Sequence, residues 1–171
     1  MTDIPALTLI IGGAASGKSD HAEALLTATD RPLTYIATGQ AYDAEMEEKI
    51  ADHKARRGSN WRTIEAPLDL RPALSEVAKG DAVLVDCATL WLTNQMFSDN
   101  DLAQEETALL AALAACPAPV VVVTNEVGTG IVPENALARR FRNAQGALNR
   151  RLAAQADRVI TVIAGLPLVL K

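Results

Sequence analysis

The chain has 171 residues, 49% hydrophobic and 22% charged, a composition typical of a globular protein with one substantial core. We expect a single domain over residues 1–171. Its formal net charge of −5 argues against a general nucleic-acid-binding surface, which is usually basic. The two cysteines, Cys87 and Cys116, lack the CxxC spacing of zinc sites. No apolar run approaches the ~20 residues that span a bilayer, so we expect a cytoplasmic protein with no membrane span and no nucleic acid partner.

Short apolar runs alternate with helix-like segments along the chain, and each apolar run predicts a strand buried in a sheet. The predicted strands are residues 7–11, 33–37, 61–65, 82–86, 120–124, 158–164 and 167–170, the last two forming a pair around Gly165. The predicted helices are residues 18–28, 43–57, 70–78, 102–115 and 134–156. This alternation predicts an α/β fold with a mostly parallel sheet flanked by helices and a C-terminal strand pair.

The first predicted strand leads into a glycine-rich turn that fits the phosphate-loop pattern G-x-x-x-x-G-K-[ST]. Its members are Gly12, Gly13, Ala14, Ala15, Ser16, Gly17, Lys18 and Ser19. In such a loop the backbone N–H groups surround a phosphate, a catalytic Lys18 reaches the β- and γ-phosphates, and the Ser19 hydroxyl ligates Mg²⁺. The alternative is a strand–helix turn that binds nothing, but the complete pattern between a strand and a helix favours a nucleotide.

Two further strands deliver polar residues to the edge of the sheet where ligands bind. Asp86 ends an apolar strand, as a Walker B acid does, which predicts a place beside the magnesium ion; a cap of the following segment is the alternative. The strand at 120–124 leads to Asn125 and Glu126, which are candidate substrate or second-loop residues. An ordinary polar loop before a helix is the alternative for this pair.

The stretch KIADHKARRGSNWRTIEAP, residues 49–67, contains one of the two histidines, His53, followed by three cations within four residues. Met46, Ile50 and His53 have helical spacing, so the residues alone allow either an inward helical stripe or a nucleophilic imidazole. The other histidine, His21, lies in the helix after the phosphate loop, where a solvent-facing position is the simpler interpretation.

Several segments together resemble a known family: GGAASGKSDHAEAL, YIATGQAYDAEMEEKIADHKARR, NWRTIEAP, the strand ending in Asp86, and TNEVGTGIVPEN. The chain resembles the bifunctional adenosylcobinamide kinase / adenosylcobinamide-phosphate guanylyltransferase family of cobalamin biosynthesis, over nearly its whole length. The resemblance implies a P-loop, RecA-like fold and a homotrimer. It departs from the family at Ala15, where members often carry Arg, and at Asp86, where some carry Glu.

The resemblance also implies an activity and a set of site residues. The enzyme would phosphorylate adenosylcobinamide with GTP or ATP and Mg²⁺, and would then transfer GMP from GTP to the new phosphate through a guanylylated His53. Its nucleotide contacts would be the phosphate loop with Thr38, Gly39, Gln40, Lys54, Ala55, Arg56, Arg57, Glu65 and Asp86, and its metal ligands Ser19 and Asp86.

The chemistry fits these residue types. A neutral imidazole attacks phosphorus readily, and neighbouring cations disfavour imidazolium while neutralising the leaving pyrophosphate. The kinase step needs a base, for which Asp86 and Glu126 are the candidates. Trp91, Met96 and Phe97 either line an apolar corrinoid surface or pack in the core, and core packing is the simpler expectation.

Two other functions fit the phosphate loop alone. One is a small-molecule kinase without a covalent intermediate, and the other is a nucleotide-gated regulatory module.

Overall fold

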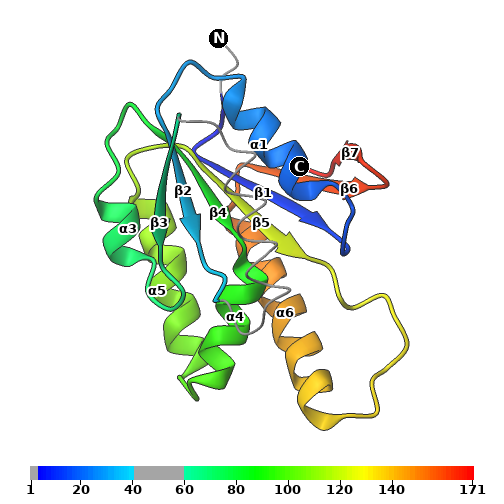
Figure 1. Ribbon diagram of the computed structural model, residues 1–171. Coiled ribbons are helices and arrows are strands. Elements are labelled where there is room, and N and C mark those ends of the chain that lie inside the picture. Colours follow the sequence, from blue (N-terminus) through cyan, green and yellow to red (C-terminus); the bar gives the residue numbers. More distant parts are fainter. Residues whose placement is uncertain (1–3, 41–59) are drawn as a thin grey trace.

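The computed structural model describes residues 4–40 and 60–171, and within them one seven-stranded sheet runs in the order β3-β2-β4-β5-β1-β6-β7 (Figure 1). The strands are β1 (Leu7–Gly12), β2 (Leu33–Ala37), β3 (Trp61–Glu65), β4 (Ala82–Asp86), β5 (Val120–Asn125), β6 (Arg158–Ile163) and β7 (Leu166–Val169). All neighbouring pairs are parallel except β6 and β7. The predicted mostly parallel sheet with a C-terminal strand pair is confirmed.

The described helices are α1 (Lys18–Thr27), α3 (Arg71–Ser75), α4 (Ala88–Phe97), α5 (Leu102–Ala115) and α6 (Ala136–Gln155). The predicted helix over residues 43–57 lies outside the described residues, and so do His53, Lys54, Ala55, Arg56 and Arg57.

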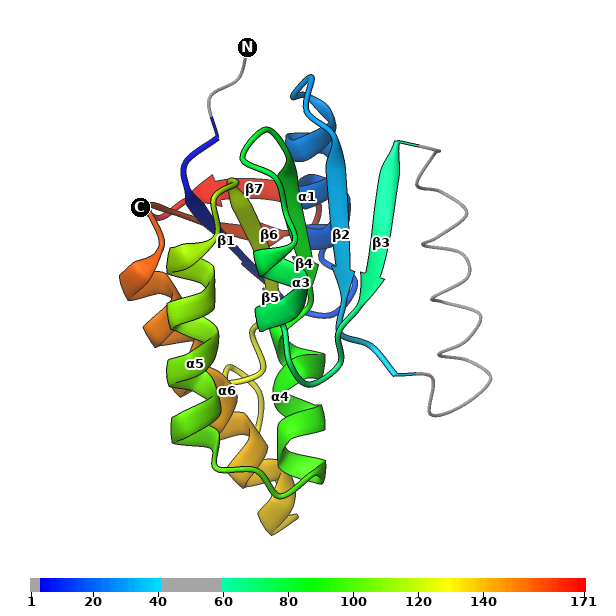
Figure 2. The ribbon, with the colours of Figure 1, turned by 90° about the vertical axis from the view of Figure 1, so that its left-hand side faces the viewer.

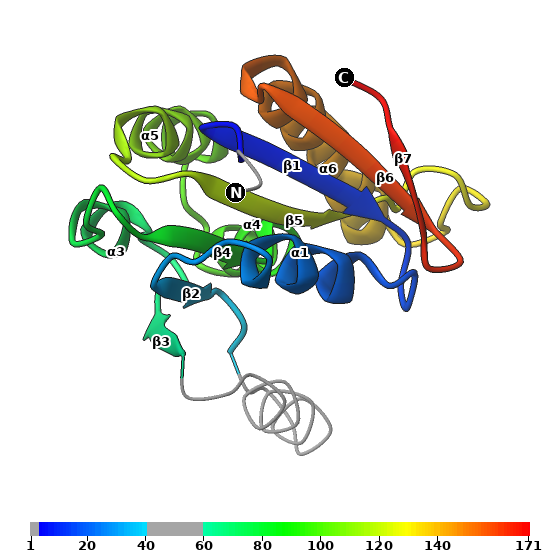
Figure 3. The same ribbon diagram turned by 90° about the horizontal axis from the view of Figure 1, so that it is seen from above.

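Each face of the sheet has its own core. On one face, α1 places Ala22 and Leu26 against inward side chains such as Ile10 and Leu84. On the other face, α3, α4, α5 and α6 form a larger core, in which Trp91 is the bulkiest fully buried side chain. Seen from above, α1 lies on one side of the sheet and α5 and α6 on the other (Figure 3). Burial on both faces explains why the central strands read as unbroken apolar runs rather than alternating ones.

Helices α1, α3 and α6 differ from their predicted bounds, α1 by only one residue at its end, and one further helix had no prediction. Helix α4 was not predicted, since its buried polar residues obscure a helical pattern. Helix α3 ends at Ser75 instead of residue 78, because the Asp81 carboxylate accepts from the Ala78 N–H and holds the following residues in a turn. Helix α6 begins at Ala136 rather than 134, because the Asn135 side chain caps it by accepting from the Ala138 N–H at 3.0 Å.

The topology gathers the candidate site residues at the carboxyl edge of the sheet. Strand β5 lies between β1 and β4, so Gly12, Asn125 and Asp86 end three adjacent strands. Helix α4 follows Asp86 and extends past the strand ends (Figures 1 and 2). None of the described helices is long and apolar enough to cross a bilayer.

Candidate nucleotide-binding site

The phosphate loop joins the end of β1 to the start of α1. Gly17 is the N-cap of α1 in a left-handed conformation, and no side chain caps the helix. The first N–H groups of α1 therefore remain available to an anion, and the helix dipole adds positive potential there. This is the geometry that the eight-residue pattern predicted.

Two glycines are required for different reasons. A Cβ at Gly12 would lie 2.3 Å from Ser16 Oγ and 2.8 Å from the Val162 carbonyl oxygen, which leaves no room for a side chain. Gly17 has φ of 89°, and a Cβ there would approach Gly165 Cα to 3.2 Å. Close packing at one position and backbone conformation at the other thus fix the shape of the loop.

Polar groups inside the loop have the arrangement of an anion site. Lys18 Nζ donates to the Gly13 carbonyl at 3.0 Å, which folds the ammonium over the loop. The buried Ser16 Oγ has no hydrogen-bond partner within the described residues. Buried hydroxyls are rarely left unpaired, so a bound phosphate oxygen is a suitable partner.

Two other segments brace the loop from outside. The turn between β6 and β7 donates the Gly165 N–H to the Ser16 carbonyl at 2.8 Å. The end of β5 donates the Glu126 N–H to the Gly12 carbonyl at 3.1 Å. The phosphate loop is therefore held by the C-terminal strand pair and by the second loop, neither of which adjoins it in sequence.

Asp86 and Lys18 both act on the buried Cys87. Burial, the largest cause, and the negative charge of Asp86 together raise the pKa of the Cys87 thiol to about 12, while the positive charge of Lys18 acts in the opposite direction. Both charges thus lie close enough to influence one thiol, so the structure brings the lysine and the predicted Walker B acid to the same place. The Ser19 hydroxyl and Asp86 carboxylate are the oxygen donors that Mg²⁺ prefers.

The predicted contacts on β2 and β3 differ in accessibility. Thr38 is fully buried, and its hydroxyl donates to the Cys87 carbonyl and accepts from the Cys87 N–H, both at 2.7 Å. Gly39 and Gln40 follow it and are partly buried. Glu65 is exposed at the end of β3, four strands from β1, which corresponds to roughly 19 Å at ~4.8 Å per strand. The phosphate loop and Glu65 are therefore well separated along the edge.

The second loop is anchored by a buried polar network that the sequence did not reveal. Thr124 Oγ1 donates to Asn149 Oδ1 at 2.7 Å, and Asn149 Nδ2 donates to the Asn125 carbonyl at 3.0 Å. The Asn125 N–H donates to Thr89 Oγ1 at 2.8 Å. The Glu126 carboxylate, which is exposed, accepts from the Gly128 N–H of its own loop. The backbone of Asn125 is thus tied to both α4 and α6.

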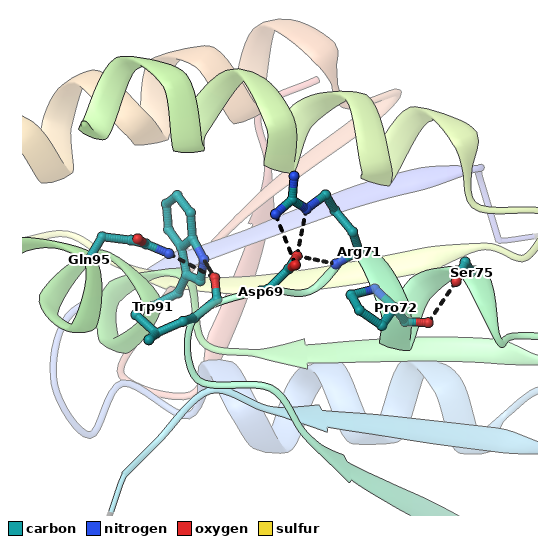
Figure 4. A network of polar contacts seen from close by, with 7 residues as sticks. Asp69, Arg71, Pro72, Ser75, Trp91 and Gln95 are labelled. Carbon is teal, nitrogen blue, oxygen red and sulfur yellow. Dashed lines mark hydrogen bonds and ion pairs between the residues drawn. The ribbon is translucent and has the colours of Figure 1, made fainter. Parts of the chain in front are cut away.

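Helix α4 also holds the loop between β3 and α3. Trp91 Nε1 and Gln95 Nε2 both donate to the Leu68 carbonyl, at 2.9 and 2.7 Å (Figure 4). In the same loop, Asp69 accepts from Arg71 at 2.7 Å, and this hydrogen bond lowers the pKa of the Asp69 carboxyl. The sequence contained no signal for the two hydrogen bonds to Leu68, because they join residues more than 20 positions apart.

The structure shows which of the ambiguous side chains pack in the core and which are exposed. Trp91 is buried and Met96 packs against the core, as expected of core residues. Phe97 is 65% exposed, so core packing was the wrong expectation for it. With Leu137 and Phe141 it lines an apolar groove of about 290 Å³ between α4 and α6. His21 is partly buried instead of fully solvent-facing, since it lies in the first turn of α1 beside the loop.

A complete phosphate loop on a parallel sheet, with an acid ending a nearby strand, defines a nucleotide-binding protein of the P-loop NTPase fold. Solved structures agree on the fold. The flagellar accessory protein FlaH from Methanocaldococcus jannaschii has a TM-score of 0.52 at 14% identity, covering 98% of this chain and 79% of that one. An ATPase from the type III secretion system of pathogenic bacteria has a TM-score of 0.52 at 11% identity, covering 92% and 51%.

Sequence comparison identifies the family. The pattern of the family described as cobinamide kinase / cobinamide phosphate guanyltransferase matches residues 8–170. The bifunctional adenosylcobalamin biosynthesis protein CobP of Pseudomonas aeruginosa is 46% identical over 166 residues, 95% of this chain and 96% of that protein. The corresponding CobU of Salmonella typhimurium is 45% identical over 181 residues, 96% of this chain and 99% of that protein. The chain belongs to the cobinamide kinase / cobinamide phosphate guanyltransferase family.

Proposed function

We propose that this protein carries out two reactions on one substrate. It phosphorylates the hydroxyl of adenosylcobinamide with GTP or ATP, and it then transfers GMP from GTP to that phosphate to give adenosylcobinamide-GDP. The family match across residues 8–170, joined to an intact phosphate loop, carries this proposal. Both steps consume nucleoside triphosphates, so we place the enzyme in the cytoplasm.

The kinase step uses the phosphate loop. Lys18 and the N–H groups at the start of α1 bind the β- and γ-phosphates, and the substrate hydroxyl oxygen attacks the γ-phosphorus. The bond from that phosphorus to the β–γ bridging oxygen breaks, and the nucleoside diphosphate leaves. We assign Asp86 to the metal side, which leaves Glu126, exposed beside the loop, as the group that accepts the hydroxyl proton.

Mg²⁺ fits the oxygen donors at this edge. Ser19 and Asp86 would hold it, and when bound it would neutralise charge on the phosphates. Across residues 4–40 and 60–171, no three His, Cys, Asp or Glu side chains gather into a metal site. This suits an ion whose remaining ligands are phosphate oxygens and water.

The transfer step uses the stretch around His53. The His53 imidazole attacks the α-phosphorus of GTP, a phosphorus–nitrogen bond forms, and pyrophosphate leaves. An oxygen of the substrate phosphate then attacks the same phosphorus and releases the imidazole. Lys54, Arg56 and Arg57 neutralise the pyrophosphate charge. Glu65 ends β3, four strands along the edge from the phosphate loop.

We also propose that the protein assembles as a homotrimer through its C-terminal strand pair. Strand β7 is an edge strand, and an exposed edge offers unpaired backbone groups. The strand pair and the tail after it expose five large apolar side chains: Ile163, Leu166, Leu168, Val169 and Leu170. Exposed apolar residues gathered on an edge are typical of an interface between subunits.

The test follows both products. The protein is incubated with adenosylcobinamide, Mg²⁺ and GTP. The corrinoid products are then separated, and their masses are determined by mass spectrometry. We expect the phosphorylated and then the GDP-linked corrinoid. Lys18→Ala should lower the first step at least ~100-fold, since it removes a charge that stabilises the transferring phosphoryl group. A product that stops at the phosphate would instead support a simple kinase, and hydrolysis without corrinoid product would support a regulatory module.

A further inference from the structure

A buried group of hydrogen bonds joins the ends of three strands beside Asp86. Its members are Thr38, directly after β2, and Asn94, on α4, together with the Asp86–Cys87 backbone; we call this group the edge clasp. Thr38 is fully buried and Asn94 is 2% exposed. Polar side chains buried to this degree are kept when their hydrogen bonds are satisfied and useful.

Thr38 binds the Asp86–Cys87 backbone through both its backbone N–H and its side-chain hydroxyl. The Thr38 N–H donates to the Asp86 carbonyl at 3.2 Å. The Thr38 hydroxyl donates to the Cys87 carbonyl and accepts from the Cys87 N–H, both at 2.7 Å. Strands β2 and β4 pair only as far as Ala37 and Asp86. The side chain of Thr38 therefore continues the attachment one residue beyond the sheet, where the backbone bearing Asp86 turns into α4.

Asn94 extends the clasp to a third loop. Its Nδ2 donates to the Thr38 carbonyl at 2.8 Å and to the Pro67 carbonyl at 2.9 Å. A primary amide has two N–H protons, and both are used on carbonyls from different segments. An aspartate at this position would have the same shape, but its carboxylate oxygen would face the Thr38 and Pro67 carbonyl oxygens, which are also acceptors. The position therefore requires an amide, and it fixes β2, β4 and the loop after β3 relative to one another.

We propose that Thr38 and Asn94 are positioning residues, which hold the Asp86 carboxylate where the Mg²⁺ of the nucleotide binds. The inference rests on the proposed role of Asp86. It also revises the direct nucleotide contact expected for Thr38, because its hydroxyl, N–H and carbonyl are all bound within the protein. A displacement of about 1 Å at a catalytic group costs on the order of 100-fold in rate, so one hydrogen bond on the backbone of Asp86 and two on the adjoining Cys87 are mechanistically important.

The experiment measures binding as well as turnover. A fluorescent GTP analogue is titrated onto each folded variant with and without Mg²⁺, and the ratio of the two dissociation constants gives the magnesium-dependent gain in affinity. Thr38→Val keeps the shape and removes the hydroxyl, while Thr38→Ser keeps the hydroxyl. Asn94→Asp keeps the shape and removes both donors. Leu152→Val, in the buried core on α6, reports the effect of a loss of stability alone.

We expect Thr38→Val and Asn94→Asp to reduce the magnesium-dependent gain about ten-fold and to raise the Mg²⁺ concentration for half-maximal kinase activity by a similar factor. Binding without Mg²⁺ should be unchanged, because it depends on the phosphate loop. Thr38→Ser should restore the gain. Leu152→Val should lower the melting temperature and leave the gain intact.

The opposite results would overturn the proposal. A wild-type gain in Thr38→Val would show that the clasp has a structural role only, even if Asn94→Asp does not fold. A loss that follows melting temperature across all variants, Leu152→Val included, would show the same. Asp86→Asn distinguishes the metal-side role of Asp86 from the positioning role of the edge clasp. A normal magnesium-dependent gain in Asp86→Asn would refute both roles. If Asp86→Asn loses the gain while Thr38→Val and Asn94→Asp keep it, only the role of the edge clasp is refuted.

Discussion

At the scale of single residues, the phosphate loop depends on backbone packing as much as on its polar groups. A side chain at Gly12 would collide with Ser16 Oγ and the Val162 carbonyl, whereas a Cβ at Gly13 meets no atom within 4 Å. We predict that Gly12→Ala lowers the free energy of unfolding by about 1–3 kcal/mol through overpacking. Gly13→Ala should stay within ~0.5 kcal/mol of wild type. Urea unfolding measures both, and equal losses would contradict the packing observed at Gly12.

Cys87 gives a prediction about pH. An unfolded thiol ionises near pH 8.5, whereas burial raises the pKa of Cys87 to about 12 in the folded protein. The folded state binds the proton more tightly, so this contribution to stability is complete below pH ~8.5 and is lost as pH rises toward 12. The stability difference between wild type and Cys87→Ala should therefore fall by up to ~1.4 kcal/mol per pH unit above pH 9.

Cys116 provides the internal control for that prediction. It is only partly buried, whereas Cys87 is buried, and burial raises the pKa of the Cys116 thiol as well. Alkylation of the native protein at pH 8 should modify Cys116 first and leave Cys87 intact until the protein unfolds. Prompt alkylation of Cys87 would show that the thiol is not buried in solution.

At the scale of elements, α5 and α6 are joined by an ion pair in which the carboxylate partner is buried and the arginine is more exposed. Arg151 Nη1 donates to Glu106 Oε2 at 2.6 Å, and Glu106 is 7% exposed. Arg151→Met leaves the Glu106 carboxylate without its cation, so we predict a loss of about 1–3 kcal/mol in the free energy of unfolding. Adding Glu106→Gln removes the isolated charge and should recover part of this loss. A double variant less stable than Arg151→Met would contradict the account.

The elements also show why sequence predicted some parts of the molecule and not others. Strands such as Leu33–Ala37 and Ala82–Asp86 were predicted to the residue, because burial on both faces leaves an apolar run with clear ends. Helix α4 carries Asn94 and Gln95 in buried positions, so its pattern of apolar residues is broken and it was missed. Those polar residues are buried because each binds a carbonyl of a distant loop. The feature that hid the helix is thus the one that gives it a role.

The candidate site likewise has parts that could be predicted from the sequence and parts that could not. The phosphate loop was predictable because all of its residues are adjacent in sequence and each has a defined chemical task. The position of Asp86 at the end of β4 was predictable from the apolar run before it, whereas its role beside the metal stays a prediction. The partners of Thr38 were not predictable, because Cys87 and Asn94 lie 49 and 56 residues away. Phe97 was misassigned to the core, since an aromatic residue in an apolar stretch does not reveal which side of the helix is covered.

At the scale of the whole molecule, the C-terminal strand pair connects the proposed trimer interface to the phosphate loop. Its turn donates the Gly165 N–H to the phosphate loop, and its strands expose the apolar residues that we propose as the trimer interface. We predict that Leu168→Asp produces monomers by placing a charge in that interface. Sedimentation velocity would detect the change, and Leu137→Asp, on an exposed apolar residue of α6, is the matched control. A Leu168→Asp trimer would contradict this interface.

In the proposed function one chain performs both reactions, and His53 is the covalent carrier of GMP. The most direct measurement incubates the protein with Mg²⁺ and GTP labelled at the α-phosphate, denatures it, and counts the label retained on the chain. We predict retained label that is stable to alkali, released by acid and absent from His53→Ala, while His21→Ala still carries it. Wild-type protein without label, or His53→Ala with it, would contradict the account.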